Sequence, residues 1–235
     1  MRLKFVPDFS SISKKHFNSS HLNNFHVINP RYEPLQNAYN RLIKRLFDLF
    51  FSSMVIIFIL SWLYPLLAII IKWQSKGPVL FKQMRTGKKN EPFCCYKFRS
   101  MYIDVGDECQ QAIRGDCRVT PIGKFIRRTS LDEMPQFFNV LMGKMSIVGP
   151  RPHMIKHTSD YNDNIHNFMV RHFVKPGITG LAQVSGLRGE IKKVSDMKRR
   201  VNADIKYVQR WNLITDIKIC FLTIIITLKG DKNAF

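Results

Sequence analysis

The sequence predicts a mostly helical α+β protein, with one membrane helix before a compact polar domain and amphipathic helices at the lipid interface. Three observations support this prediction. No charged residue occurs from Leu49 to Ile71, residues 77–101 read as two strands around a turn, and residues 190–212 place apolar side chains at intervals of three and four. A chain of 235 residues has room for one such domain and its appendages.

The charge balance narrows the class of partner. Lysine and arginine total 37 against 17 aspartates and glutamates, a formal net charge of +20. Such an excess favours an anionic membrane surface or a phosphorylated substrate. We expect no nucleic-acid partner, because no zinc-finger spacing, RNP-like segment or basic zipper accompanies the charge. The five cysteines include no CxxC pair, which indicates a reduced, cytosol-facing compartment rather than a disulfide framework or a zinc site.

Residues 1–37 are expected to form a polar, loosely ordered tail. Ser, Asn and His are scattered through them without a hydrophobic period. A signal peptide would need a cationic start, a short apolar core and a cleavage site with small residues, and this segment has none of these.

Residues 38–73 are expected to form the membrane helix. The uncharged run from Leu49 to Ile71 would reach roughly 35 Å as a straight helix, enough to span a bilayer. Pro65 inside the run argues for a bend, because proline removes a helical hydrogen bond. Basic residues flank both sides, which favours placing both ends in the cytoplasm. These residues are Arg41, Lys44 and Arg45 before the run, and Lys72, Lys76, Lys82 and Arg85 after it. A re-entrant helix hairpin that dips into the inner leaflet fits both the proline and the flanking charges, whereas a spanning helix fits only the length. The hairpin is therefore expected over residues 38–73, with the spanning helix as the alternative.

Residues 74–235 are expected to form the polar domain. Two strands should lie around the turn signal TGKKNEP within residues 77–101, followed by helical spacing across 102–113. A short helix should begin near Pro135 and end at Gly143, and residues 174–186 should form a structured loop.

The last third of the chain contains two apolar segments. The apolar stripe of residues 190–212 suits either a helix packed on the core or one lying on anionic lipid, with core packing favoured. The run from Ile219 to Leu228 is too short to span a membrane and suits the interface.

An acidic pair, Asp132 and Glu133, stands within the basic segment RRTSLDEMPQFFNVLMGKMSIVGPRP. The letters SLDE match a helix capping box, while Pro135 suits the first position of a helix. Under either interpretation both carboxylates lie at a helix start. This placement is expected to lower the pKa of Asp132 and keep it ionised, able to act as a nucleophile or a metal ligand.

Basic residues surround the acidic pair in the sequence. Arg127 precedes it, Arg151 follows it, and Lys97 and Arg99 lie in the segment YKFRSM. Guanidinium groups bind phosphoryl oxygens, so together with a carboxylate-held Mg²⁺ these residues suit a diphosphate substrate. The sequence contains no Walker A, GxGxxG, HRD or DFG motif.

From about Arg41 to Leu228 the sequence resembles the bacterial sugar transferase family, the monotopic phosphoglycosyl transferases that start glycan assembly on undecaprenyl phosphate. Five motifs in order carry the resemblance. They are GPVLFKQMRTGK, YKFRSM, the segment from Arg127 to Pro152, VKPGITGLAQVSG and YVQRWNLITDIKI. The segments GPRPHMIKH, VKPGITG and RGE are most similar to the branch that transfers glucose 1-phosphate.

The resemblance implies an enzyme of the bacterial cytoplasmic membrane with a cytosolic catalytic domain. A sugar 1-phosphate would pass from a UDP-sugar to undecaprenyl phosphate with release of UMP, the first membrane step of polysaccharide assembly. It implies that Asp132 attacks phosphorus and binds Mg²⁺, that Glu133 assists, and that four basic residues bind phosphate. These four are Lys97, Arg99, Arg127 and Arg151. It also implies a re-entrant helix, whose usual Ser-Pro pair is Tyr64-Pro65 in this chain.

Two other functions are consistent with parts of the sequence. A non-catalytic membrane-attached protein would use the basic surface on anionic inner-leaflet lipid, at about 1 kcal/mol per lysine or arginine near it. A spanning glycosyltransferase would release UDP rather than UMP. The sequence leaves open the sugar, the polysaccharide pathway and whether the chain forms a homo-oligomer.

Overall fold

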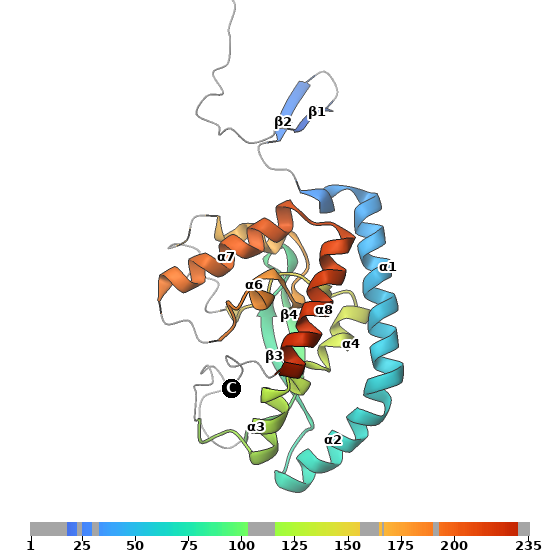
Figure 1. The fold of residues 1–235 in the computed structure, drawn as a ribbon, viewed down its shortest axis with the longest axis vertical. Coiled ribbons are helices and arrows are strands. Elements are labelled where there is room, and N and C mark those ends of the chain that lie inside the picture. Colours follow the sequence, from blue (N-terminus) through green and yellow to red (C-terminus); the bar gives the residue numbers. More distant parts are fainter. Residues whose placement is uncertain are drawn as a thin grey trace, which may run out of the picture.

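The fold is described from a computed structural model of the chain (Figure 1). It covers residues 18–22, 25–29, 33–102, 116–155, 165, 167–189 and 193–229. The helix expected over 102–113 lies outside these ranges beyond Tyr102. The described part is mostly helical with small sheets, as the sequence predicts.

Two strands occur where the sequence predicts a loosely ordered tail. Strands β1 (Asn18–Leu22) and β2 (Phe25–Asn29) pair antiparallel, and a single turn of 3-10 helix, η1 (Pro34–Gln36), follows. Val27 and Ile28, which favour extended backbone, lie within β2 and outweigh the polar composition around them.

One long helical stretch follows, bent and lying along one side of the molecule in Figure 1. It comprises α1 (Ala38–Val55), a π-helical segment η2 (Ile56–Leu60) and α2 (Ser61–Gln74). Among the described residues, this is the one helix long and apolar enough to cross a membrane. Pro65 lies inside α2, where it cannot donate to the carbonyl of Ser61. The π-helical segment directly before α2 gives a second local cause for the bend.

The distribution of polar and apolar side chains on helix α1 is the reverse of that on an amphipathic helix of a soluble protein. Its buried residues are polar, namely Lys44, Asp48 and Ser52, one turn apart. Large apolar side chains face outward along α1, η2 and α2. They include Leu42, Leu46, Phe50, Ile57, Phe58, Trp62, Leu66, Ile69 and Trp73. Monomeric soluble proteins rarely expose so large an apolar surface, so this face indicates association with a membrane.

Helix α8 (Leu213–Lys229) also exposes large apolar side chains, including Ile214, Ile217 and Phe221. Its buried residues are Asp216, Ile219 and Cys220, so its inward face is mixed. The expected apolar run Ile219–Leu228 therefore lies within a longer helix that turns much of its apolar surface outward.

The polar domain contains the remaining elements. Strands β3 (Leu80–Thr86) and β4 (Pro92–Phe98) form the expected antiparallel hairpin, and strands β5 (Ser146–Val148) and β6 (Gly177–Thr179) pair in parallel. The helices are α3 (Pro121–Arg128), α4 (Gln136–Leu141), α6 (Leu181–Val184) and α7 (Val194–Gln209), with 3-10 segments η3 (Lys88–Asn90), η4 (Leu131–Glu133) and η5 (Phe168–Phe173).

Two local predictions are confirmed and one is corrected. Helix α4 begins after Pro135, and Gly143 follows it with a φ of +77°, as the sequence indicates. The segment expected as a loop contains β6 and α6, because the short strand finds a partner in β5, far away in sequence.

The core lies between the long helix and the polar domain. Leu63, Leu67 and Ile71 of α2 join buried side chains of β4, α4, β5 and α7 in one cluster. The apolar stripe of α7 is also buried, with Met197 and Val201 fully enclosed. Core packing is therefore the correct interpretation of that stripe.

Both ends of the long helix are tied to the polar domain. The Arg45 guanidinium donates to the carbonyls of Val140 and Leu141 at the end of α4, at 2.7 and 2.8 Å. Arg99, which follows β4, donates to the carbonyls of Ser75 and Lys76 just beyond α2, at 2.6 and 2.8 Å. Orphan carbonyls at helix ends need such donors when they are buried.

We expect Arg99→Ala to destabilise the fold by about 1–3 kcal/mol, because it leaves two partly buried carbonyls without donors. The thermal midpoint in detergent should fall by roughly 2–10 °C. Arg128→Ala, which removes an exposed arginine from α3, is the matched control and should change little. Equal midpoints for the two variants would show that Arg99 does not hold the end of α2.

Candidate active site

The acidic pair lies in η4, a single turn between α3 and α4. Ser130 before it has left-handed backbone (φ +57°) and its side chain caps no amide. The Ser130 hydroxyl instead accepts from the Arg188 guanidinium at 2.9 Å. The capping-box interpretation is therefore wrong, although both carboxylates do lie just before a helix.

Glu133 is held by two cations. Lys97 Nζ lies 3.0 Å from one carboxylate oxygen, and Arg151 donates to both oxygens. Burial opposes ionisation of Glu133, but the charges of Arg151 and Lys97 outweigh it and hold its pKa well below the usual range. Glu133 is therefore a fixed anion that positions two basic side chains.

Asp132 differs from its neighbour. Its side chain is largely buried, at 8% exposed, and among the described residues no hydrogen bond or ion pair to its carboxylate is found. Burial raises the pKa of Asp132, and the Glu133 charge adds to this, against the lowering effect of Lys97 and Arg127. The expected lowering of its pKa is therefore corrected: desolvation, which the sequence does not reveal, outweighs the attraction of the neighbouring cations.

The structure brings together most of the predicted site residues. Lys97 and Arg151 contact Glu133, while Arg127 and Lys97 lie near enough to Asp132 to act on its charge. Arg99 is the exception, since its guanidinium binds the carbonyls beyond α2. These contacts give no support to the phosphate role expected for Arg99.

Two features fix the frame of the site. Asn139 of α4 accepts from the amide of Tyr96 and donates to the carbonyl of Cys94, which joins α4 to the strand that carries Lys97. Gly149 leads from β5 toward Arg151, and a Cβ there would lie 2.5 Å from the carbonyl oxygen of Lys175. Only glycine allows this close approach.

Three further arginines, which the sequence does not mark as site residues, lie close to Arg151. Arg171 donates to the Arg151 carbonyl at 2.9 Å and pairs with Asp204 at 2.8 Å. Arg85 and Arg200 act on the same group of charges. No local pattern marks these arginines, because they come from separate segments.

The donor set limits how a metal ion could bind. No group of three or more His, Cys, Asp or Glu side chains suited to a metal occurs in the described residues. Glu133 is already paired with Lys97 and Arg151, so Asp132 is the carboxylate of the acidic pair that remains available to a metal ion. Mg²⁺ often binds one or two carboxylates together with substrate phosphates. Asp132 therefore fits a Mg²⁺ shared with a phosphorylated substrate.

Comparison with known proteins establishes the family. Residues 39–230 match the model of the bacterial sugar transferase family. The chain belongs to this family, as its motifs predict. It is 43% identical over 98% of its length to UDP-glucose:undecaprenyl-phosphate glucose-1-phosphate transferase of Klebsiella pneumoniae, of which it covers 49%.

Two further relatives have different names. The chain is 40% identical over 81% of its length to an exopolysaccharide production protein of Rhizobium leguminosarum bv. phaseoli, of which it covers 98%. It is 41% identical over 80% of its length to UDP-N-acetylgalactosamine-undecaprenyl-phosphate N-acetylgalactosaminephosphotransferase of Aeromonas hydrophila, covering 44%. The chain spans about half the length of the first of these three relatives.

We expect Arg151→Met to destabilise the fold by about 1–3 kcal/mol, since it leaves the buried Glu133 with Lys97 alone. About a third of the Arg151 side chain is exposed, which keeps the loss below that of a fully buried pair. Glu133→Gln in the Arg151→Met background should recover part of the loss, because it removes the underpaired charge. Thermal unfolding of the two single variants and the double variant measures this, and strictly additive losses would contradict the pairing.

Proposed function

We propose that the chain transfers a sugar 1-phosphate from a UDP-sugar to undecaprenyl phosphate, giving undecaprenyl-diphosphate-sugar and UMP. The observation that supports it most is the contrast within the acidic pair. Glu133 is paired with two cations, whereas the Asp132 carboxylate has no hydrogen-bond or ion-pair partner among the described residues. The reactions for which the Klebsiella and Aeromonas relatives are named support the same reaction class.

In the first half-reaction, an Asp132 oxygen attacks the phosphorus that carries the sugar. A new bond forms between this oxygen and phosphorus, and the bond from phosphorus to the oxygen bridging the two phosphates breaks. The bridging oxygen leaves with the electron pair as part of UMP. The sugar phosphate is then bound covalently to Asp132.

In the second half-reaction, an oxygen of undecaprenyl phosphate attacks the same phosphorus. The bond between phosphorus and Asp132 breaks, the carboxylate regains its electron pair, and the diphosphate-linked sugar is complete. A carboxylate serves both halves because it attacks as an anion and leaves as an anion.

The basic residues supply the charge that this chemistry needs. Lys97 and Arg151, held by Glu133, face the acidic pair, and Arg127 adds a further positive charge near Asp132. Preorganised cations stabilise the charge on a transferring phosphoryl group. Asp132 would hold Mg²⁺, which when bound screens the diphosphate charge and favours the ionised carboxylate.

The sugar is proposed to be glucose. The motifs GPRPHMIKH and VKPGITG favour the glucose branch, and the Klebsiella relative is named for glucose 1-phosphate. The N-acetylgalactosamine relative belongs to the same similarity range, so a panel of UDP-sugars is the direct comparison.

The long helix is proposed to be re-entrant in the cytoplasmic membrane, with the site on the cytosolic face. Arg45 near its start and Arg99 at its end both attach it to one compact domain. A spanning helix would place those attachments on opposite sides of the bilayer. The apolar outer faces of α1, α2 and α8 would enter the inner leaflet, where anionic lipid attracts the net charge of +20.

We expect Asp132→Asn to lower turnover at least about a thousandfold, because the amide cannot attack phosphorus. The assay measures UMP from UDP-glucose and undecaprenyl phosphate with purified protein. Without the lipid acceptor, the wild type should release UMP only up to the amount of enzyme, and mass spectrometry should find the sugar phosphate on Asp132. A non-catalytic membrane protein would release no UMP, and a glycosyltransferase would release UDP. An active Asn variant would rule out the covalent route.

We expect Gln36→Cys and Lys76→Cys, at exposed positions flanking the long helix, to be labelled from the same side of the membrane. The measurement uses a cysteine-free background and a thiol reagent that does not cross intact cells. Both sites should react after the cells are opened, and neither should react before. Labelling of one site alone in intact cells would establish a spanning helix.

A further inference from the structure

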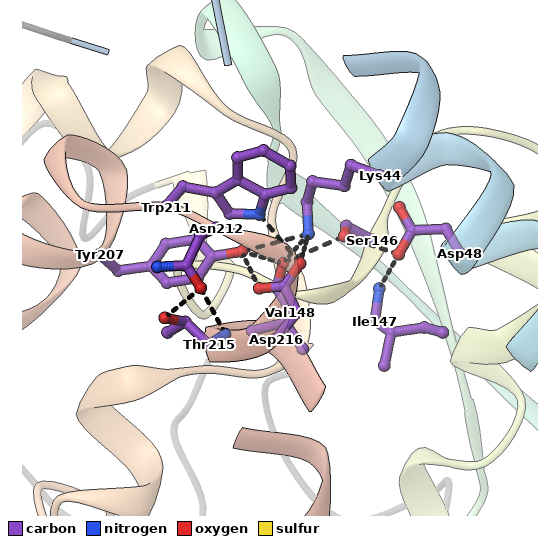
Figure 2. Close-up of polar contacts among 10 residues, drawn as sticks. All are labelled: Lys44, Asp48, Ser146, Ile147, Val148, Tyr207, Trp211, Asn212, Thr215 and Asp216. Carbon is purple, nitrogen blue, oxygen red and sulfur yellow. Dashed lines mark hydrogen bonds and ion pairs between the residues drawn. The ribbon is translucent and has the colours of Figure 1, made fainter. Parts of the chain in front are cut away.

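A buried polar cluster that does not include the acidic pair joins the long helix to β5 (Figure 2). Lys44 of α1 directs its three donors to Asp216, the Val148 carbonyl and the Tyr207 hydroxyl, at 2.7, 3.0 and 3.1 Å. The Trp211 indole donates to Asp216 at 2.9 Å. The lysine charge is thus paired and its hydrogen bonds are satisfied, which a buried ammonium requires.

One turn further along α1, Asp48 binds the start of the same strand. One of its carboxylate oxygens accepts from the Ser146 hydroxyl at 2.9 Å and from the Ile147 amide at 3.0 Å. Asp48 and Ser146 are both buried. Helix α1 therefore holds both ends of the three-residue strand β5, and Figure 2 shows the two side chains reaching it from the same helix.

Hydrogen bonds hold the backbone between β5 and Arg151 in place. The Gly149 amide donates to the Thr179 carbonyl, the Gly177 amide to the Pro150 carbonyl, and Arg171 to the Arg151 carbonyl, all at 2.9 Å. Hydrogen bonds thus fix every residue from Val148 to Arg151. The guanidinium at the end of this path pairs with Glu133.

We propose that Lys44 and Asp48 are positioning residues, which fix β5 and through it the Arg151 guanidinium beside the acidic pair. The membrane helix then does more than attach the protein to lipid, because its inward polar face sets part of the active site. The effect on rate rests on the proposed function, whereas the effect on the strand does not.

The chain offers a graded set of variants. Asp48→Leu removes the acceptor for Ile147 and Ser146, whereas Asp48→Asn keeps an acceptor oxygen of the same reach. Tyr207→Phe removes one oxygen from the other end of the cluster and keeps the ring. Ser52→Ala is the matched control, since this buried hydroxyl of the same helix face donates to the carbonyls of its own helix, those of Asp48 and Leu49.

The kinetic test is the rate of UMP release from UDP-glucose by purified protein. Asp48→Leu should lower it about tenfold, since small displacements of a positioned group have effects of this order or greater. Asp48→Asn should restore most of the rate, and Ser52→Ala should leave it unchanged. In the Arg151→Lys background, Asp48→Leu should cost less than about twofold, because residues that act through one group are not additive. A fully additive loss, or a normal rate for Asp48→Leu, would overturn the proposal.

Hydrogen exchange supplies a readout that does not depend on activity. Amides in residues 146–151 should exchange faster in Asp48→Leu and Tyr207→Phe than in wild type, and at the wild-type rate in Ser52→Ala. If Asp48→Leu does not fold, Tyr207→Phe carries both tests, with a rate loss of about threefold. Unchanged exchange in Tyr207→Phe would overturn the proposal. A wild type that releases no UMP would refute the proposed function, and exchange would still decide the role of the strand contacts.

Discussion

The buried contact between Lys44 and Asp216 fixes which face of α1 packs against the polar domain, and the placement of the site depends on it. A charge inside a protein is costly unless a partner of opposite sign meets it, so this lysine must face the domain rather than lipid. Turning Lys44 inward also turns Asp48 and Ser52 inward, because side chains four positions apart share a helix face. The opposite face of α1 is then apolar and outward. The membrane-facing surface and the attachment of β5 thus have one cause.

Local patterns in the sequence were sufficient for several elements and for the family. The strands around TGKKNEP, the helix after Pro135 and the apolar stripe of α7 lie where propensity and periodicity place them. Two features could not be predicted in this way: the lack of a partner for the Asp132 carboxylate, and the attachment of Arg99 to the end of α2. Both depend on which segments, distant in sequence, come to lie beside those side chains, and one sequence without a fold does not give that.

The basic residues that flank the long helix are weaker evidence for its membrane topology than their number in the sequence suggests. Lys44 and Arg45 count as cytoplasmic flank charges in the sequence, yet Lys44 binds Asp216 and Arg45 caps α4. Lys44 is buried, so its charge does not face the lipid headgroups. The spacing of Lys44, Asp48 and Ser52 every four residues was a readable signal of a polar helix face, and it points to the interior of the domain rather than to water.

The inverted polarity of α1 has a consequence for how the chain is made. Lys44 and Asp216 are 172 positions apart, so the lysine leaves the ribosome long before its partner exists. At roughly 5–20 residues per second the interval is about 10–30 s. During this time the nascent helix carries an unpaired ammonium that must stay in water or reach the lipid headgroups. A helix synthesised late therefore completes the packing of one synthesised early, and α1 reaches its final position against the polar domain only after α8 is translated.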